Sequence, residues 1–150
     1  MSLVPILPPS GLVRVIYASR WGACVAEDLH HVVRQIVNRS MQNNRQVDIT
    51  GLLLVHGGWF MQVLEGPSAS VAETFARIAA DGRHFDITVL ASGSAEQRLF
   101  RDWNMGELRI SSSDYRLLEH LGLDGKFSPA QLDAERALTL LTSIGQAHAA

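Results

Sequence analysis

The sequence predicts an α+β fold of the ferredoxin-like type, a mixed sheet with two helices on one face. The order of periodic segments is strand, helix, strand, strand, helix, strand, followed by one extra strand. Gly57-Gly58 separates two apolar runs, which is a standard signal for a two-residue hairpin. Hydrophobic residues make up 47% of the 150 residues, enough for the core of one domain.

The first half of the fold is predicted as a strand, a helix and a hairpin. Residues 12–19 alternate and are rich in β-branched side chains, which predicts a strand. In residues 26–44 apolar side chains recur at helical spacing, and acidic residues occupy the first turn, where the helix dipole favours them. Residues 49–66 form the two strands of the hairpin, which Pro67 ends.

The second half begins with a helix over the sequence SVAETFARIAADG. Ser70 and Glu73 stand at capping-box spacing, and Gly82 is the expected C-terminal stop. Residues 85–93 and 105–110 supply the last two strands.

Beyond Ile110 the pattern becomes helical. Ser128, Pro129 and Gln131 predict a helix that begins there, with an apolar face further along. The chain therefore divides into an irregular lead-in, a main domain and a C-terminal helical cap that packs on the sheet or on a partner: residues 1–10, 11–110 and 111–150.

Composition narrows the classes of function. The net charge of −2, with no long run of either sign, argues against nucleic-acid binding. No apolar stretch approaches the roughly 18 residues of a membrane span, and prolines interrupt the N-terminus where a signal peptide would be apolar. The lone cysteine, Cys24, excludes an internal disulfide and a cysteine-built metal site. We expect a cytoplasmic protein without a metal.

Motifs of common enzymes are missing from the sequence. It contains no HExxH, CxxC, GxSxG or P-loop pattern, and His30 and His31 are adjacent on a helix and face different directions. Composition and spacing therefore predict a ferredoxin-like domain with polar side chains directed into a buried space, and they indicate no classical catalytic site.

One polar residue is out of place in an apolar strand. Phe60, Gln62 and Leu64 share one strand face, and Gln62 is expected to point between the sheet and the helices. A buried amide without partners costs on the order of 1–3 kcal/mol, so it must be paired. The pattern alone favours a structural bond to Tyr17 or to a neighbouring backbone group.

Ordinary structural roles account for other polar and aromatic residues near these elements. Asn44, beside Asn43 at a helix end, suits a helix C-cap, and Glu65 before a Gly-Pro turn suits a surface or turn-bonding carboxylate. Arg83 and His84 suit solvated loop residues. Trp103 and Met105 suit packing residues in the core or at the sheet edge.

Four segments resemble the BLUF domain, a family of blue-light sensors that use a flavin. They are IYASR, NNRQVDITGLLLVHGGWFMQVLEGP, IAADGRHFDITVL and RLFRDWNMG, between about Leu12 and Ile110. The resemblance implies a photoreceptor and not an enzyme, and its cofactor would be FAD, with FMN or riboflavin as alternatives.

The resemblance also implies roles for individual residues. Tyr17 matches the tyrosine that gives an electron and a proton to the excited flavin, and Gln62 the glutamine between that tyrosine and the ring. Asn44 matches the asparagine on the pyrimidine edge of the flavin. Four further residues match positions that line the flavin site: Ser40, Asp81, Arg83 and His84. Trp103 and Met105 match the pair on the last strand that responds to rearrangement of the glutamine.

In this family pattern the glutamine rearranges and the absorption shifts to the red. We expect the last strand and the C-terminal helices to pass this state to a separate signalling protein. The apolar C-terminal helix favours a homodimer or higher oligomer. Two alternatives stay open on the same fold: an acylphosphatase-like hydrolase in which Arg83 and Asn44 hold phosphate and water, and a flavin-free interaction module.

Overall fold

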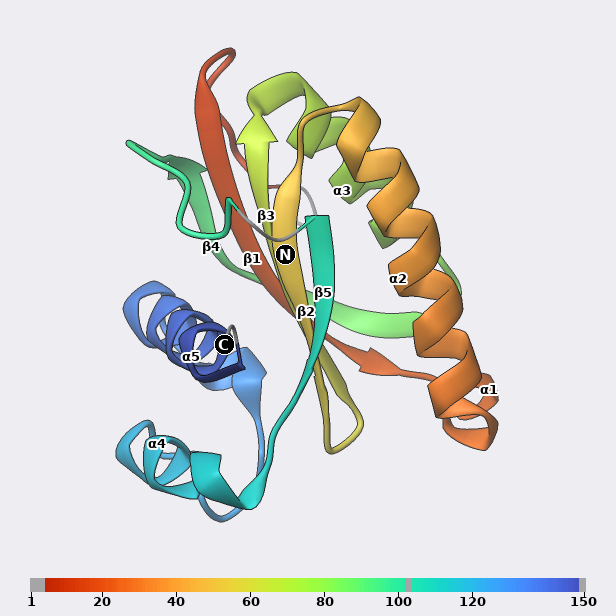
Figure 1. Ribbon diagram of the computed structural model, residues 1–150, viewed down its shortest axis with the longest axis vertical. Coiled ribbons are helices and arrows are strands. Elements are labelled where there is room, and N and C mark those ends of the chain that lie inside the picture. Colours follow the sequence, from red (N-terminus) through yellow and green to blue (C-terminus); the bar gives the residue numbers. More distant parts are fainter. Residues whose placement is uncertain (1–4, 102–103, 149–150) are drawn as a thin grey trace.

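The computed structural model describes residues 5–101 and 104–148. Within them, five strands form one sheet in the order β4-β1-β3-β2-β5 (Figure 1). Neighbouring strands are antiparallel except for the parallel pair β2 and β5, so the sheet is mixed as predicted. The strands are β1 (Leu12–Trp21), β2 (Thr50–His56), β3 (Trp59–Pro67), β4 (His84–Ser94) and β5 (Asn104–Arg109).

The helices lie on both faces of this sheet (Figure 1). They are α1 (Ala23–Glu27), α2 (Leu29–Gln46), α3 (Ser68–Ala79), α4 (Tyr115–His120) and α5 (Ala134–His148), with 3₁₀ turns at Ser112–Asp114 and Pro129–Gln131. Helices α2 and α3 cover one face, and the C-terminal helices α4 and α5 lie on the other. No helix in the described ranges is long and apolar enough to cross a membrane. The predicted ferredoxin-like arrangement is confirmed.

Alternation along β3 divides its side chains between two cores. Phe60 and Leu64 belong to the cluster beneath α2 and α3, whereas Met61 and Val63 belong to the cluster beneath α5. Gln62 therefore lies on the α2 and α3 face, as the sequence predicted.

Glycines hold β3 in place at two points. Gly57 and Gly58 both have positive φ, +57° and +88°, which matches the twist of a tight hairpin between β2 and β3. A Cβ on Gly51 of β2 would lie 1.9 Å from the carbonyl oxygen of Val63, so no other residue fits there without moving β3. Both features keep β2 close against the strand that carries Gln62.

The ends of α3 differ from the prediction. The capping box of Ser70 and Glu73 is wrong, because the helix begins at Ser68. The backbone N–H of Ser68 donates to the carbonyl of Gly11, and its hydroxyl donates to the carbonyl of Pro8. These contacts with the lead-in satisfy the first turn, so tertiary structure replaces the local cap. The helix ends at Ala79, and Gly82 is not its stop.

The predicted start of the C-terminal helix is also wrong. Pro129 begins a short 3₁₀ turn, and Leu132 is extended, which interrupts the helix. Helix α5 begins after Asp133, whose carboxylate accepts the backbone N–H of Arg136 at 2.8 Å. The predicted first helix is likewise divided at Asp28 into α1 and α2.

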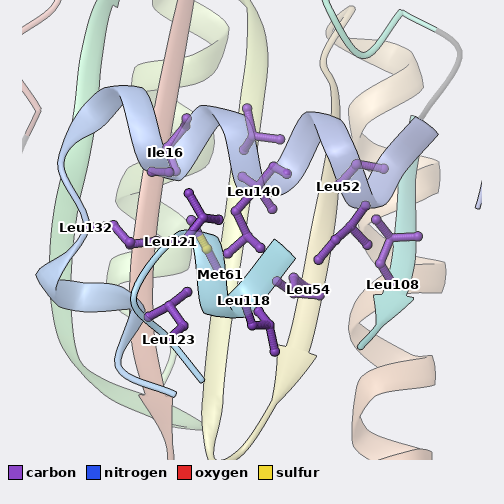
Figure 2. Packing of buried hydrophobic residues seen from close by; sticks show 14 of the residues in the cluster. Ile16, Leu52, Leu54, Met61, Leu108, Leu118, Leu121, Leu123, Leu132 and Leu140 are labelled. Carbon is purple, nitrogen blue, oxygen red and sulfur yellow. The ribbon is translucent and has the colours of Figure 1, made fainter. Parts of the chain in front are cut away.

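Helix α5 is packed on the sheet of its own chain (Figure 2). Ala137, Leu140, Leu141 and Ile144 are fully buried and join a cluster with apolar side chains of β1, β2 and β3: Ile16, Leu52, Leu54, Met61 and Val63. The apolar face of α5 is thus used within the chain, so it no longer argues for a dimer. The oligomeric state stays a prediction.

Replacement of Leu140 by alanine tests this packing. We expect the free energy of unfolding to fall by about 2–5 kcal/mol, because a fully buried leucine leaves a cavity between α5 and the sheet. Urea denaturation measures the change, with Gln146→Ala on the exposed side of α5 as control. Equal midpoints for the two variants would show that α5 does not pack here.

Candidate functional site

A cavity of about 500 Å³ opens between α2 and α3, above β3. A smaller recess of about 50 Å³ adjoins it, and the two share Ser40, Gln62, Asp81 and Arg83. The total falls within the range of pockets that hold small cofactors. The large cavity is lined by residues of α2, β3, α3 and the turn after α3: Ile36, Arg39, Ser40, Asn43, Asn44, Gln62, Leu64, Thr74, Arg77, Ile78, Ala80, Asp81 and Arg83.

Tyr17 and Gln62 form the floor of the recess. They are direct partners across β1 and β3, and each side chain is 3% exposed. The Tyr17 hydroxyl donates a hydrogen bond to Oε1 of Gln62. Because the phenol is the donor, the amide presents its oxygen to Tyr17 and its NH₂ group in another direction.

Tyr17 is held in its protonated form. Burial raises the pKa of its phenol well above the ordinary value of 10.0, and the negative charge of Asp81 raises it further. The phenol therefore remains a hydrogen-bond donor throughout the physiological range.

Asp81 and Arg83 form a close ion pair at the edge of the recess. The Arg83 Nη2 donates to Asp81 Oδ2 at 2.5 Å, Nε donates at 3.0 Å, and the backbone N–H of Arg83 also donates at 3.0 Å. These bonds hold the pKa of the Asp81 carboxyl below its usual value. The pair carries no net charge, which leaves the inner site neutral.

His84 bridges β1 and α3 beside Tyr17. Its Nε2 lies 2.6 Å from the carbonyl oxygen of Ile78, so Nε2 must donate. In the neutral imidazole Nδ1 then accepts the hydroxyl of Ser19 at 2.7 Å. The His84 ring packs against Tyr17 with its centroid 6.3 Å away, and this contact supports the orientation of the phenol.

Asn44 and Ser40 face the cavity from α2, one turn apart. The interpretation of Asn44 as a helix C-cap is wrong. Helix α2 continues to Gln46, Val47 is its C-cap, and Asn44 is 2% exposed. Its side chain lines the cavity while its backbone carbonyl accepts the N–H of Ile49 at 2.9 Å.

The structure describes the position of only one of the two residues predicted to relay the signal. Met105 lies on β5, next to the parallel strand β2. Trp103 lies outside the described residues. Their roles remain predictions.

Sequence reasoning missed several charged residues. Glu65, expected to be a surface or turn-bonding carboxylate, is fully buried and accepts a hydrogen bond from Nε of Arg14 at 2.7 Å. Arg39 and Arg77 line the cavity from opposite helices. Arg39 directly precedes Ser40 in the sequence, but nothing local indicated that α2 and α3 would bring Arg39 and Arg77 to one cavity.

Residues 12–106 match the family model described as BLUF, sensors of blue-light using FAD. The chain belongs to this family. The BLUF match spans more than half of the chain and includes both floor residues, Tyr17 and Gln62.

Two curated BLUF relatives are much longer than this chain. Photoactivated adenylate cyclase subunit beta of Euglena longa is 38% identical over 69 residues, which are 46% of this chain and 8% of that protein. The blue light- and temperature-regulated antirepressor BluF of Escherichia coli K12 is 34% identical over 87 residues, which are 58% of this chain and 20% of that protein.

Two solved BLUF structures resemble the fold over most of the chain. BlsA in its photo-activated state has a TM-score of 0.82 and 27% identity, over 89% of this chain and 94% of that one. Klebsiella pneumoniae BlrP1 with FMN and cyclic diGMP has a TM-score of 0.66 and 29% identity, over 89% of this chain and 35% of that one.

The sensor and hydrolase expectations are decided by two different observations, the BLUF match and the Asp81–Arg83 ion pair. The BLUF match confirms the prediction that this domain is a sensor and not an enzyme, because the matched region is the light-sensing one. The hydrolase alternative also loses its basis, since Arg83 is engaged by the carboxylate of Asp81.

The raised pKa of Tyr17 predicts how stability depends on pH. The folded state keeps the phenol proton where the unfolded state loses it, so this stabilisation is complete below pH 10.0 and is lost above it. Above pH 10 we expect the free energy of unfolding of the wild type to fall more steeply than that of Tyr17→Phe, by up to about 1.4 kcal/mol per pH unit. Denaturant titrations between pH 9 and 11 measure both slopes. Parallel profiles would contradict the prediction.

Proposed function

We propose that the chain is a blue-light photoreceptor that holds FAD in the cavity between α2 and α3 and signals through Tyr17 and Gln62. The hydrogen bond from the Tyr17 hydroxyl to Gln62 Oε1, at the floor of that cavity, carries the proposal. It joins a phenol, which can lose an electron and a proton together, to an amide that can exchange donor for acceptor.

The surroundings of the cavity suit a flavin ring. Its floor and walls combine apolar side chains with amide, hydroxyl and carboxylate groups, and the inner ion pair is neutral. Such pockets hold cofactors by apolar contact and orient them by a few polar groups. Gln62, Asn43 and Asn44 are the amides that line the cavity, and of these we propose Gln62 and Asn44 as partners of a ring with alternating donors and acceptors along one edge.

When bound, the flavin supplies the blue-light absorption and accepts an electron in its excited state. Tyr17 releases that electron while its hydroxyl proton moves to Oε1 of Gln62 along the existing hydrogen bond. Nε2 of Gln62 would in turn pass a proton to the bound flavin that has accepted the electron, so the amide would change tautomer and carry no net charge. Moving the proton with the electron avoids an isolated charge in a buried site. When the electron and proton return to Tyr17, Gln62 is left rearranged.

Output is proposed to run from Gln62 through β5 to the C-terminal helices. Strand β5 pairs with β2, whose Leu53 is the direct neighbour of Gln62 on β3. Met105 and Trp103 are the residues of this stretch that we propose to respond. A separate signalling protein would then read the C-terminal helices, as the name antirepressor suggests for the longer relative BluF.

The mouth of the cavity favours a flavin with a phosphate. Arg39 of α2 and Arg77 of α3 line it, both exposed, while Asp81 neutralises Arg83 deeper inside. Two positive charges on opposing helices form stronger, charge-assisted hydrogen bonds with a phosphate than with the neutral ribityl hydroxyls of riboflavin. FAD is the chromophore in the family's description, and the BlrP1 structure is named with FMN.

Gln62→Leu tests the photochemical proposal. We expect the purified variant to be yellow but to lose the reversible red shift under blue light, because leucine can neither accept the Tyr17 proton nor bond the ring. Absorption spectra before and after illumination measure the shift. Gln42→Leu, on the exposed side of α2, should keep it. A colourless wild type that stays colourless with added flavin would instead support the flavin-free module.

Arg39→Ala combined with Arg77→Ala tests the choice of flavin. We expect the dissociation constant for FMN to rise about tenfold or more, whereas the constant for riboflavin changes less than twofold, because only FMN carries a phosphate. Fluorescence quenching of each flavin measures both constants, with Arg34→Ala on α2 as control. Equal weakening of the two flavins would exclude a phosphate contact.

A further inference from the structure

Glu65 is a fully buried carboxylate on β3 that faces away from the flavin cavity. By strand alternation it belongs to the same face as Met61 and Val63, which pack in the cluster that contains α5. Its exposed fraction is 0%, although it lies within three residues of Gln62. A charge buried so completely must be fully paired.

The partners of Glu65 come from two places in the chain. Arg14 of β1 donates its Nε to Oε2 at 2.7 Å. The backbone N–H of Leu99 donates to both carboxylate oxygens, at 3.0 and 3.1 Å, and the N–H of Phe100 donates to Oε1 at 2.8 Å. Two of the three donor groups therefore belong to the segment that connects β4 to β5.

This connection crosses from one edge of the sheet to the other (Figure 1). Its Arg98 binds the start of β2, through the carbonyl of Asp48 at 2.7 Å and the hydroxyl of Thr50 at 2.9 Å. Arg98 also donates to the backbone carbonyl of Glu65 at 3.2 Å, and Arg14 donates to the carbonyl of Gln97 at 2.9 Å. We call residues 97–100 the crossover clamp.

The clamp joins the sensing strand to both candidate output elements. Residue 100 is followed, four positions later, by the start of β5. Phe100 itself is 2% exposed and packs in the cluster that holds α5 on the sheet. A displacement of the Glu65 carboxylate therefore reaches the entry of β5 and the underside of α5 together.

We propose that Glu65 is a positioning residue that transmits movement of β3 at Gln62 to β5 and α5 through the crossover clamp. Three residues of strand span roughly 10 Å, and a stiff strand moves as a unit over that length. Several charge-assisted bonds to one carboxylate make a connection that shifts without stretching. The inference rests on the proposed photochemistry of Tyr17 and Gln62.

Glu65→Gln tests the proposal in the full chain with flavin bound. The amide keeps the shape of the side chain but loses its charge and one acceptor oxygen, so it cannot hold Arg14, Leu99 and Phe100 together. Glu73→Gln, on the exposed side of α3, is the matched control. Arg14→Lys is a milder second variant, because it keeps the charge and loses the directed Nε bond.

Three readouts separate transmission from simple support. We expect Glu65→Gln to keep the amplitude of the red shift within about a fifth of wild type, since Tyr17 and Gln62 are untouched. The rate of dark recovery should change at least threefold. The light-minus-dark difference in hydrogen exchange over residues 134–148 should fall by more than half. Arg14→Lys should change the recovery rate and the exchange difference in the same direction as Glu65→Gln does.

Each other result has a definite meaning. If Glu65→Gln and Arg14→Lys both behave as Glu73→Gln does, the proposal is wrong. It is also wrong if they lower protection of residues 134–148 equally in light and dark, because that is loss of support alone. Should Glu65→Gln fail to fold, Arg14→Lys decides by the same two readouts. A wild type without a red shift would overturn the photochemical proposal itself.

Discussion

The hydrogen bond between Tyr17 and Gln62 exists only in one register of β1 against β3. Because strand side chains alternate, a slip of one residue would send Gln62 to the α5 face and Met61 or Val63 into the cavity. The hairpin glycines and the close approach at Gly51 fix the neighbouring strand, and apolar residues on both faces make any slip costly. Backbone packing thus sets the position of a single amide.

The sheet separates two kinds of interior. The face beneath α2 and α3 holds a cavity with buried polar groups, whereas the face beneath α5 is filled mainly by aliphatic side chains (Figure 2). Strand β3 contributes to both, with Gln62 on one side and Met61 and Val63 on the other. Polar groups and apolar packing therefore lie on opposite faces of one strand, which is the arrangement that the proposed signalling from Gln62 to α5 requires.

Periodicity and turn residues predicted the strands, their order and the direction of Gln62, because these depend on neighbours in sequence. The ends of α3 and α5 were missed, since contacts with Pro8 and Gly11 and an extended Leu132 outweighed local capping patterns. Glu65 was misplaced for the same reason, as its donors stand 34 and 35 residues away. The roles of Tyr17, Gln62 and Asn44 came from the resemblance to BLUF domains. Strand alternation alone predicted only the direction of Gln62, and the local pattern interpreted Asn44 wrongly as a helix C-cap.

Packing of α5 on the sheet links thermal stability to responsiveness. Residues such as Leu140 and Ile144 are core residues, so removing residues 111–150 would strip one side of the sheet as well as the signal. If light loosens α5, it does so against the same contacts that keep the domain folded. Tighter packing of α5 would then raise the stability of the domain and reduce its response to light. We therefore expect natural sequences of this kind to pack α5 with intermediate strength.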